Sequence, residues 1–424
     1  MLRARCGSGP AECRETAKPQ SRTSGEGSGD ETRECACRGE DTAGAAVYDY
    51  MEGEMVRNPF GDRLSRLRGL MEEQELDAFF VSVPENRYYV SGYEAEDHHS
   101  TETSGYVLVT ASDQYLLTDF RYEEEAKRES PGFRLVIYSQ GPGAVLRDVF
   151  TEAGCRRIGF EGHHLVFKTF REVEEALKAV SPSGVLEPFE NLVEQLRVVK
   201  DAFEVERIRT SLALAERVLE DIWETIRPGV KEKEIAWEIE RLIRERGGDG
   251  ISFPSIVAAG ANGALPHAVP TDREIEGGEA VTVDMGAKLD RYCSDITRTK
   301  MPDNPHPRLL EIYRIVREAQ LAAQDAVRAG MNSMAVDAVA RDLISGAGYG
   351  DRFGHGLGHG VGLAVHEPPG LRKSNGTVLK ENMIVTIEPG VYLPEFGGVR
   401  LENMVRVTGS GCEVLNTADL FYKR

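Results

Sequence analysis

Hydrophobic and polar residues alternate along the chain with two periods, one typical of helices and one of strands. Between Leu64 and Met71, apolar residues recur every three to four positions, which predicts an amphipathic helix. Short apolar runs predict strands at residues 78–83, 105–110, 115–118, 133–138 and 157–161. This alternation predicts a compact α/β domain over about residues 57–190. Its Asp97-His98-His99 is metal-like in composition but has no third ligand at useful spacing. We interpret it as a surface loop, which could still reach an active site across a domain or subunit boundary.

A second, larger domain is predicted over residues 191–424, where the order of elements repeats. Two helices between Asp201 and Gly248, separated by Pro228-Gly229, precede strand-like segments that continue to about Thr299. The same order then recurs as a helix over about 307–329, a shorter helix from Ser333 and strand-like segments from about 352 to 407. The repeat predicts two similar halves that pair around one site.

Residues 1–56 differ in kind from the rest. Their first fifty residues are rich in Gly, Ser, Thr, Glu and Arg and hold almost no large aliphatic side chains. Such a segment cannot bury enough apolar surface to offset its ordering entropy, so we expect a disordered or weakly ordered tail. Four of the seven cysteines lie in it, but Cys35-x-Cys37 matches no common zinc spacing. We therefore assign the tail no essential role.

The composition narrows the class of protein. The 424 residues carry 51 basic and 70 acidic side chains, a formal net charge of −19, which argues against a nucleic-acid-binding protein. The chain contains no run of 18 apolar residues and no signal-peptide core, so we expect no membrane partner. The three cysteines outside the tail are scattered, as in proteins of the reducing cytoplasm, which is the predicted location.

Two aspartates lie in apolar runs, where a charge is unexpected. Residues 280–283 lead into Asp284, residues 292–297 contain Asp295, and Leu289-Asp290-Arg291 between them can turn. We expect the two strands to pair antiparallel, which brings both aspartates close on one face. Buried like charges side by side need compensation, which a bound cation supplies. For either aspartate alone, a turn cap or bonds to backbone amides are the simpler explanation.

The second half repeats this arrangement. Residues 383–387 form an apolar run that ends in Glu388, and Arg400 and Glu402 lie two residues apart in a strand, hence on the same face. Taken alone, an Arg–Glu couple is most simply a partly exposed salt bridge. Together with the two aspartates, however, the glutamates make four carboxylates in matching contexts.

The histidines favour the metal interpretation. Residues 353–362 hold glycine at five of ten positions, so His355 and His359 are not a helical pair despite their spacing. The zinc-protease motif H-E-x-x-H is absent because its glutamate is missing. We expect these glycines to let the backbone approach a ligand or metal closely. Two further histidines, His267 and His366, lie in segments that flank the carboxylates.

The ordered set Asp284, Asp295, His359, Glu388 and Glu402 resembles the ligand set of the pita-bread metallopeptidases, which include methionine aminopeptidases, aminopeptidase P and prolidase. The resemblance covers about residues 57–424. It implies an α/β (α+β) chain, in which a smaller creatinase-like α/β N-terminal domain precedes a C-terminal pita-bread domain with pseudo-two-fold halves. It also implies a dinuclear metal site, in which Asp284 chelates one ion, Asp295 and Glu402 bridge both, and His359 and Glu388 complete the other. Four carboxylates and one imidazole suit Mn²⁺, with Co²⁺, Zn²⁺ or Fe²⁺ as alternatives.

Four segments resemble the proline-specific branch of this family. They are Ala264-Leu265-Pro266-His267, His355-Gly-Leu-Gly-His359, Val365-His366-Glu367 and Gly390-Val391-Tyr392. One departure is Ala268, where many relatives carry a second histidine. Creatinase shares the fold but lacks the metal ligands. All five are present here, which argues against a metal-free amidinohydrolase.

The resemblance also implies roles for individual residues. Glu388 shuttles a proton to the leaving nitrogen. His267 and His366 bind or stabilise the substrate carbonyl and its developing oxyanion, and His355 and Arg400 position the proline side. We therefore predict an Xaa-Pro aminopeptidase that works as a homodimer on small peptides with proline at the second position. An Xaa-Pro dipeptidase (prolidase) is the alternative, and a non-catalytic pita-bread module that binds peptides is a third hypothesis.

Overall fold

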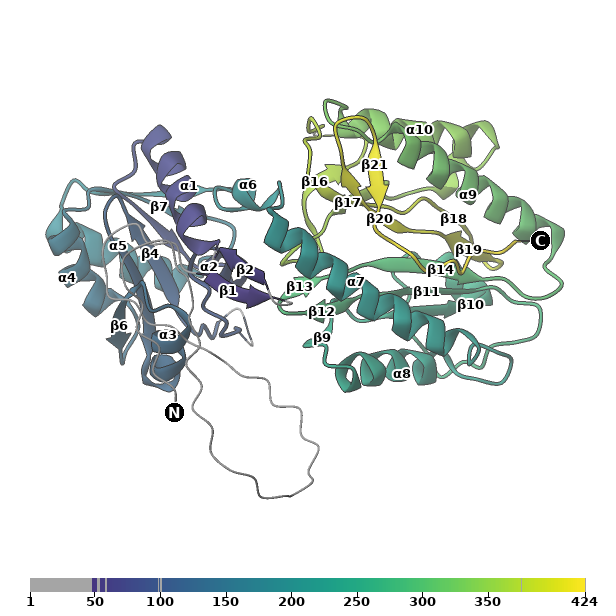
Figure 1. Cartoon of the computed structure of the whole chain (residues 1–424), viewed down its shortest axis with the longest axis horizontal. Helices are drawn as coiled ribbons and strands as arrows, with labels where there is room; N and C mark the ends of the chain where they lie inside the picture. Colours follow the sequence, from purple (N-terminus) through teal and green to yellow (C-terminus); the bar gives the residue numbers. More distant parts are fainter. Residues whose placement is uncertain are drawn as a thin grey trace, which may run out of the picture. The chain divides into compact units, whose positions relative to one another are not determined.

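A computed structural model describes residues 48–51, 54–57, 59–97, 99, 101–374 and 376–423 of the chain (Figure 1). Most of the predicted tail, including Cys35-x-Cys37, lies outside the described residues, and so does His98. At the end of the tail, β1 (Tyr48–Met51) and β2 (Glu54–Arg57) pair antiparallel. Within the described residues, no helix combines the length and the apolarity that crossing a bilayer requires.

A six-stranded mixed sheet forms the centre of the first α/β unit. Its strand order is β6-β5-β4-β3-β7-β8, with β4 antiparallel to both neighbours and the other pairs parallel. The strands are β3 (Ala78–Val81), β4 (Tyr106–Thr110), β5 (Gln114–Asp119), β6 (Arg134–Tyr138), β7 (Arg157–Glu161) and β8 (Val185–Phe189). The five predicted strands are thus confirmed to within a residue or two, and β8 is an addition to them.

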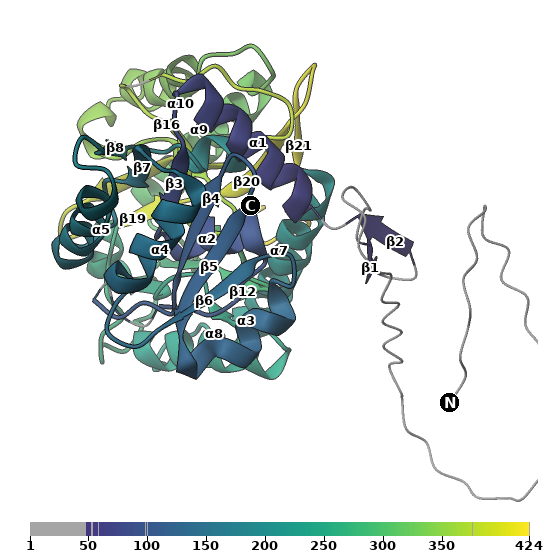
Figure 2. The same cartoon turned by 90° about the vertical axis from the view of Figure 1, so that its left-hand side faces the viewer.

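Helices cover both faces of this sheet, which explains why its central strands are apolar at nearly every position (Figure 2). The face of Phe79 packs against α1 (Phe60–Glu73) and α2 (Pro84–Ser91). The face of Phe80 packs against α4 (Gly143–Ala153) and α5 (Phe167–Val180). The short helices are α3 (Glu123–Glu129) and, at the junction to the larger unit, α6 (Glu194–Arg197).

The larger unit begins with a half in which two helices precede antiparallel strands. The helices are α7 (Ala202–Trp223) and α8 (Glu232–Glu245). A sheet of order β10-β11-β14 follows, made of β10 (Ile256–Ala259), β11 (Val281–Met285) and β14 (Ile296–Lys300). A second small sheet contains β9 (Gly250–Ile251), β12 (Ala287–Leu289) and β13 (Tyr292–Cys293). The predicted turn is confirmed, because Asp290 and Arg291 adopt positive φ between β12 and β13.

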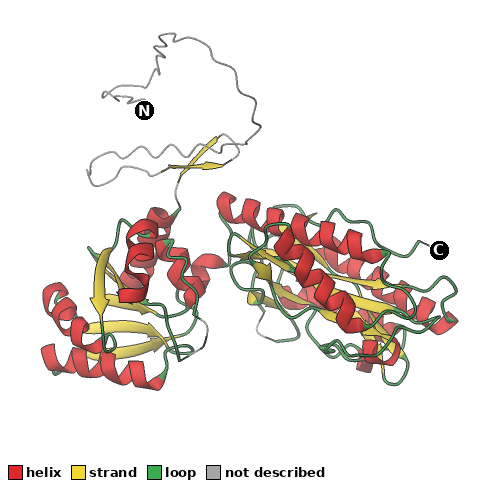
Figure 3. Cartoon of the chain, turned by 90° about the horizontal axis from the view of Figure 1, so that it is seen from below, coloured by secondary structure: helices red, strands yellow, loops and turns green. Residues whose placement is uncertain are grey.

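The second half repeats this order of elements. It starts with α9 (Pro307–Ala326) and α10 (Ser333–Gly346). Its main sheet has the order β16-β15-β17-β20-β21, and β18 pairs with β19. The strands are β15 (Gly358–Gly360), β16 (Glu367–Leu371), β17 (Ile384–Ile387), β18 (Gly390–Leu393), β19 (Gly397–Arg400), β20 (Asn403–Val407) and β21 (Cys412–Val414). The strands of this unit lie among its helices in Figure 3. The predicted repeat of helix, helix and strands is therefore confirmed.

Candidate active site

A cavity of about 520 Å³ is lined by residues of both halves of the larger unit. Eight of the nine residues predicted to form the site line it: His267, Asp284, Asp295, His355, His359, His366, Glu388 and Arg400. The ninth, Glu402, is 1% exposed and clusters with two of the lining residues. The structure thus brings all nine residues to one place, although they are spread over more than 130 positions of the sequence.

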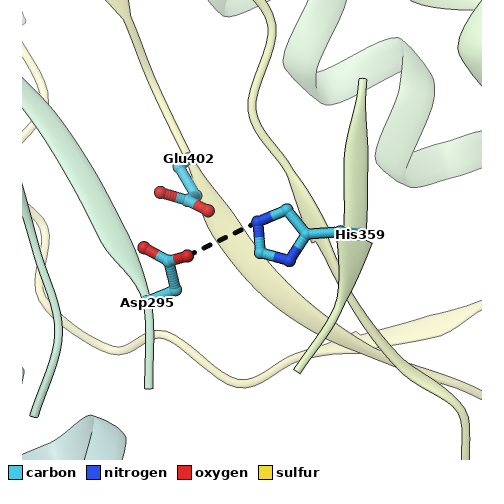
Figure 4. Close-up of side chains that lie close together, drawn as sticks. All are labelled: Asp295, His359 and Glu402. Atoms are coloured by element: carbon cyan, nitrogen blue, oxygen red, sulfur yellow. Dashed lines mark ion pairs between the residues drawn. The ribbon is translucent and has the colours of Figure 1, made fainter. Parts of the chain in front are cut away.

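Asp295, His359 and Glu402 form the centre of the site (Figure 4). Each offers one ligand atom, and these atoms lie within 4.8 Å of one another. His359 Nε2 is 3.5 Å from Asp295 Oδ2 and 3.3 Å from Glu388 Oε1. Such a set of carboxylates around one imidazole can hold a divalent cation.

The strand pairs of the two halves place the carboxylates. Asp284 lies in β11 opposite Thr297 of β14, and Asp295 immediately precedes β14. In the second half, Glu388 follows β17 and Glu402 precedes β20. The two halves meet at Thr297, whose Oγ1 donates to Glu402 Oε2 (2.7 Å) and whose carbonyl accepts from the Glu402 amide (3.1 Å). Each half therefore contributes two carboxylates, one from the end of a strand or just after it and one from just before the strand that pairs with it.

The cluster has more acceptors than donors. Asp284 Oδ1, Asp295 Oδ1 and Glu402 Oε1 are buried and lack a hydrogen-bond partner among the described residues. Burial and the charges of Glu402 and Asp284 raise the pKa of Asp295 well above its usual range. Burial and the charge of Glu388 raise the pKa of Glu402 to about 8. Buried oxygens without donors are costly, and a bound cation removes that cost. The residues therefore fit the metal site that the resemblance implies.

His359 and Glu388 form an ion pair at the edge of this cluster. Burial opposes the charge on both, but their hydrogen bond lowers the pKa of Glu388 to about 2 and raises the pKa of His359 to about 9. Thr386 Oγ1 donates to Glu388 Oε1 (3.2 Å) and accepts from the His359 amide (3.1 Å). One threonine of β17 thus fixes both residues.

The glycines around His359 allow neighbouring strands to approach closely, a purpose beyond the one predicted. His359 lies in β15, so the exclusion of a helical histidine pair is confirmed. A Cβ on Gly358 would collide with the backbone carbonyl of Thr386, and one on Gly360 would collide with that of Pro368. The close approach is therefore to neighbouring strands. Gly358 also lines the cavity, so the expectation that these glycines let the backbone approach a ligand or metal stays a prediction.

Arg400 and His355 are engaged by protein groups. The Arg400 guanidinium donates to Asp284 Oδ2 (2.6 Å), Tyr392 Oη (2.9 Å), the Pro266 carbonyl (3.1 Å) and Thr297 Oγ1 (3.3 Å). His355 Nδ1 contacts the Gly356 carbonyl (2.7 Å), and Nε2 contacts Tyr392 Oη (2.8 Å). Burial lowers the pKa of His355, which favours a neutral ring that donates through Nδ1 and accepts from the Tyr392 hydroxyl.

His267 and His366 are the exposed histidines of the cavity. The rings of His366 and His359 meet edge to face, with centroids 4.3 Å apart. Burial and the neighbouring His359 lower the pKa of His366. Ala268, the departure from the family motif, packs with Ile256 and Ala258 in a small apolar cluster. Both histidines are thus placed to meet a ligand in the cavity.

Three cavity or near-cavity residues received no role from the sequence. Tyr392 joins His355 to Arg400, and its only signal was its place in a family-like motif. Thr297 joins the two halves. Arg372 is an exposed cation of the cavity lining that forms no ion pair with a described residue. Neither Thr297 nor Arg372 stands out in the sequence, because each lies in a segment of similar polar residues.

The Asp97-His98-His99 segment contributes nothing to this cavity in the described residues. Asp97 accepts from Arg87 (3.0 Å) and from the Ser104 amide (2.7 Å), so it closes a loop of the first unit. His99 is exposed. Its interpretation as a surface loop agrees with these contacts.

Known proteins resemble the chain over most of its length. The model of "Metallopeptidase family M24" matches residues 206–409, and that of "Creatinase/Prolidase N-terminal domain" matches residues 63–199. The Xaa-Pro dipeptidase of Pyrococcus furiosus is 34% identical over 360 residues, which are 84% of this chain and 98% of that protein. The solved Xaa-Pro dipeptidase from Bacillus anthracis shares 37% identity with a TM-score of 0.79, covering 84% of this chain and 97% of that chain. The solved X-Pro aminopeptidase from Thermotoga maritima shares 34% identity with a TM-score of 0.75, covering 84% and 98%.

Proposed function

Because the chain belongs to metallopeptidase family M24, with a creatinase-type domain before its pita-bread domain, we propose that it is an Xaa-Pro dipeptidase. It hydrolyses the peptide bond before the proline of two-residue peptides. This was the alternative to our first prediction, an aminopeptidase. The dipeptidase names of the relatives from Pyrococcus furiosus and Bacillus anthracis support the change, whereas the Thermotoga maritima relative is called an aminopeptidase.

Two divalent metal ions are proposed to bind Asp284, Asp295, His359, Glu388 and Glu402. The support is the orphaned, buried carboxylate oxygens of this cluster. When bound, the ions polarise the scissile carbonyl and lower the pKa of the attacking water. Mn²⁺ remains our preferred ion because the donor set is rich in oxygen.

The remaining chemistry is assigned to protein groups around the cluster. Glu388 accepts a hydrogen bond from Thr386, which fixes its carboxylate, and it is proposed to take a proton from water and pass it to the leaving proline nitrogen. His267 and His366 are proposed to contact the substrate carbonyl and its developing negative charge from the open side of the cavity. His355 and Arg400 were predicted to bind substrate. Their contacts support another role: Arg400 holds Asp284 directly, and His355 holds Arg400 through the Tyr392 hydroxyl.

Arg372 is the observation that carries the dipeptidase proposal. A dipeptide places a free carboxylate one residue beyond the scissile bond, whereas a longer peptide places an uncharged amide there. Among the described residues that line the cavity, Arg400 is already paired with Asp284, and Arg372 is the arginine without an acidic partner. A planar guanidinium binds a carboxylate through two donors. Arg372 is therefore proposed to select a proline with a free carboxylate.

Three substrates test this proposal after loading with Mn²⁺: Ala-Pro, Ala-Pro-amide and Ala-Pro-Ala. We expect strong cleavage of Ala-Pro alone. Arg372→Met should raise KM for Ala-Pro at least tenfold and remove the preference over the amide. The matched control is Lys373→Met, which removes a neighbouring exposed cation that does not line the cavity. Efficient cleavage of Ala-Pro-Ala by the unaltered enzyme would show that the aminopeptidase prediction was the better one.

The complete ligand set argues against the non-catalytic binding module, because such modules usually lose ligands.

The homodimer and the cytoplasmic location stay predictions. Size-exclusion chromatography with light scattering tests the first of these at micromolar concentration.

A further inference from the structure

One buried carboxylate closes the loop that carries His267. Glu232, in the first turn of α8, is 0% exposed. It accepts from the Ala259 amide (2.8 Å) at one end of the loop, and from the Thr271 amide (2.9 Å) and Thr271 Oγ1 (2.7 Å) at the other. Asn262 Nδ2 donates to the same carboxylate at 2.9 Å. We call residues 259–271 the His267 loop.

The donors to Glu232 come from this loop alone. No described Lys or Arg forms an ion pair with Glu232, so its direct hydrogen-bond donors are all neutral, and the charge of Arg273 acts on it only from a greater distance. Charge-assisted bonds of this kind are about twice as strong as neutral ones. The amide of Lys233 adds a bond to the Thr271 carbonyl (3.2 Å) and ties the helix terminus to the same loop end. All hydrogen bonds that the Glu232 carboxylate accepts therefore come from the His267 loop.

The middle of the loop is held from the metal side. Arg400 donates to the Pro266 carbonyl, one residue before His267, and Ala268 is buried against Ile256 and Ala258. His267 itself is exposed toward the cavity, as is Val269, which is 76% exposed. With both ends fixed by Glu232 and the centre fixed by Arg400, His267 has little freedom to leave the position that faces the cluster.

We infer that Glu232 is a positioning residue: by closing the His267 loop, it sets where His267 meets the substrate carbonyl. This rests on the proposed role of His267. Glutamine is a poor substitute, because both oxygens of Glu232 accept hydrogen bonds. In either orientation of the glutamine side chain, its NH₂ group would therefore face a donor. Releasing the loop lets His267 drift, and a displacement of about 1 Å near a reacting group can cost about 100-fold in rate.

A double-mutant cycle with Ala-Pro as substrate tests the inference. Glu232→Gln should lower kcat/KM about 30- to 100-fold, and His267→Ala by at least as much. If Glu232 acts through His267, adding Glu232→Gln to His267→Ala should cost less than about threefold more. Bound metal, measured by elemental analysis, should stay at the level of the unaltered enzyme in both variants, because neither residue is a proposed ligand.

Several outcomes separate failure of this inference from failure of the proposed function. Full, independent losses from the two substitutions would overturn the inference while leaving His267 its role. Normal activity of His267→Ala would overturn both the inference and that role. The proposed function itself is tested by the unaltered enzyme, which does or does not cleave Ala-Pro.

Two further variants keep the test decisive. If Glu232→Gln fails to fold, Thr271→Val can replace it, because it removes only the hydroxyl donor to the carboxylate. Its smaller loss in kcat/KM should likewise disappear in the His267→Ala background. Thr271→Ser keeps the hydroxyl and should restore activity. Asp97→Asn is a matched stability control, because Asp97 also accepts bonds that close a loop, in the first unit. Asp97→Asn should lower the melting temperature, and its effect on kcat/KM should be independent of His267→Ala. If its effect depended on His267→Ala as strongly as that of Glu232→Gln, the inference would be overturned.

Discussion

The hydroxyl of Tyr392 joins two residues that were first expected to contact substrate. It lies 2.8 Å from His355 Nε2 and 2.9 Å from an Arg400 nitrogen. Tyr392→Phe leaves both groups without this partner and loosens the hold of Arg400 on Asp284. Outer contacts of metal ligands typically affect metal affinity or activity 10- to 100-fold. We expect a loss of this size in kcat/KM for Ala-Pro, measured at saturating Mn²⁺.

Tyr313→Phe is the control for this substitution. Its hydroxyl is also buried and accepts from the Tyr422 amide (2.8 Å), but it lies outside the described cavity lining. It should lower the free energy of unfolding by about 1 kcal/mol and leave kcat/KM unchanged. Equal kinetic losses in both variants would mean that Tyr392 stabilises the fold without a specific role at the site.

Metal binding should release protons at pH 7. In the metal-free protein, burial and neighbouring charges raise the pKa of Glu402 to about 8 and that of Asp295 well above its usual range. Glu402 is therefore largely protonated at pH 7, as is His359 with its pKa of about 9, until a cation displaces the protons. The apparent enthalpy of Mn²⁺ binding should depend on the ionisation enthalpy of the buffer, and this dependence should shrink at pH 9. An enthalpy that is the same in all buffers at pH 7 contradicts the prediction.

The same shift has a consequence for stability. The folded pKa of Glu402 lies above that of an unfolded glutamate, about 4.3. The contribution of protonated Glu402 to folding stability is therefore fully present below the unfolded pKa, and it is lost as the pH rises through about 8. The metal-free protein should lose stability over this range, so Mn²⁺ should raise the melting temperature more at pH 8 than at pH 5.

At the scale of single elements, the strand β15 requires a glycine at position 358. Gly358→Ala places a methyl group against the Thr386 carbonyl of β17 and pushes the strand that carries His359 away from its neighbour. Overpacking of this kind costs about 1–3 kcal/mol. We expect a lower midpoint in urea and weaker metal binding. Gly346→Ala is the control with the opposite sign, because Gly346 ends α10 with open space around it, and alanine favours a helix.

Element types could be predicted from the sequence, but their ends and contacts could not. The apolar spacing of α7 continues to Ile226, yet the helix ends at Trp223. A helix reaching Pro228 would press the proline ring against the carbonyl four residues earlier, and Ile226 is buried without being helical. The glycines near His359 were recognised as a signal of close approach. The sequence does not say what approaches, because that depends on strands 8 to 28 residues away.

At the scale of the whole molecule, the predicted residues share one feature. Asp284, Asp295, Glu388 and Glu402 stand out because a charge in an apolar strand is unexpected, and the structure brings them together. Glu232 and Arg372 could not be found in this way. Each lies in a polar segment, where one more charge carries no signal, and its role depends on loops brought close only by the tertiary fold.

The junction between the two α/β units makes a last prediction. Arg197 and Lys200 lie in this junction, and both form ion pairs with the buried Glu367. Lys200 Nζ lies 2.6 Å from Glu367 Oε1. Glu367 directly follows His366 in the sequence. Burial would raise the pKa of Glu367, but the two cations hold it below its usual range. Glu367→Ala leaves two buried cations without this partner and should cost about 3–5 kcal/mol of unfolding free energy.

Lys200→Met should cost less, about 1–3 kcal/mol, because Arg197 still pairs with Glu367. Urea denaturation measures both values, and the ranking is the test: a Lys200→Met variant less stable than Glu367→Ala contradicts the proposed balance of charges. The control is Lys233→Met, which removes an exposed pair with Asp272 and should leave stability unchanged. Because Glu367 adjoins His366, the loss in kcat/KM for Ala-Pro should follow the same ranking, which would tie the junction to the active site.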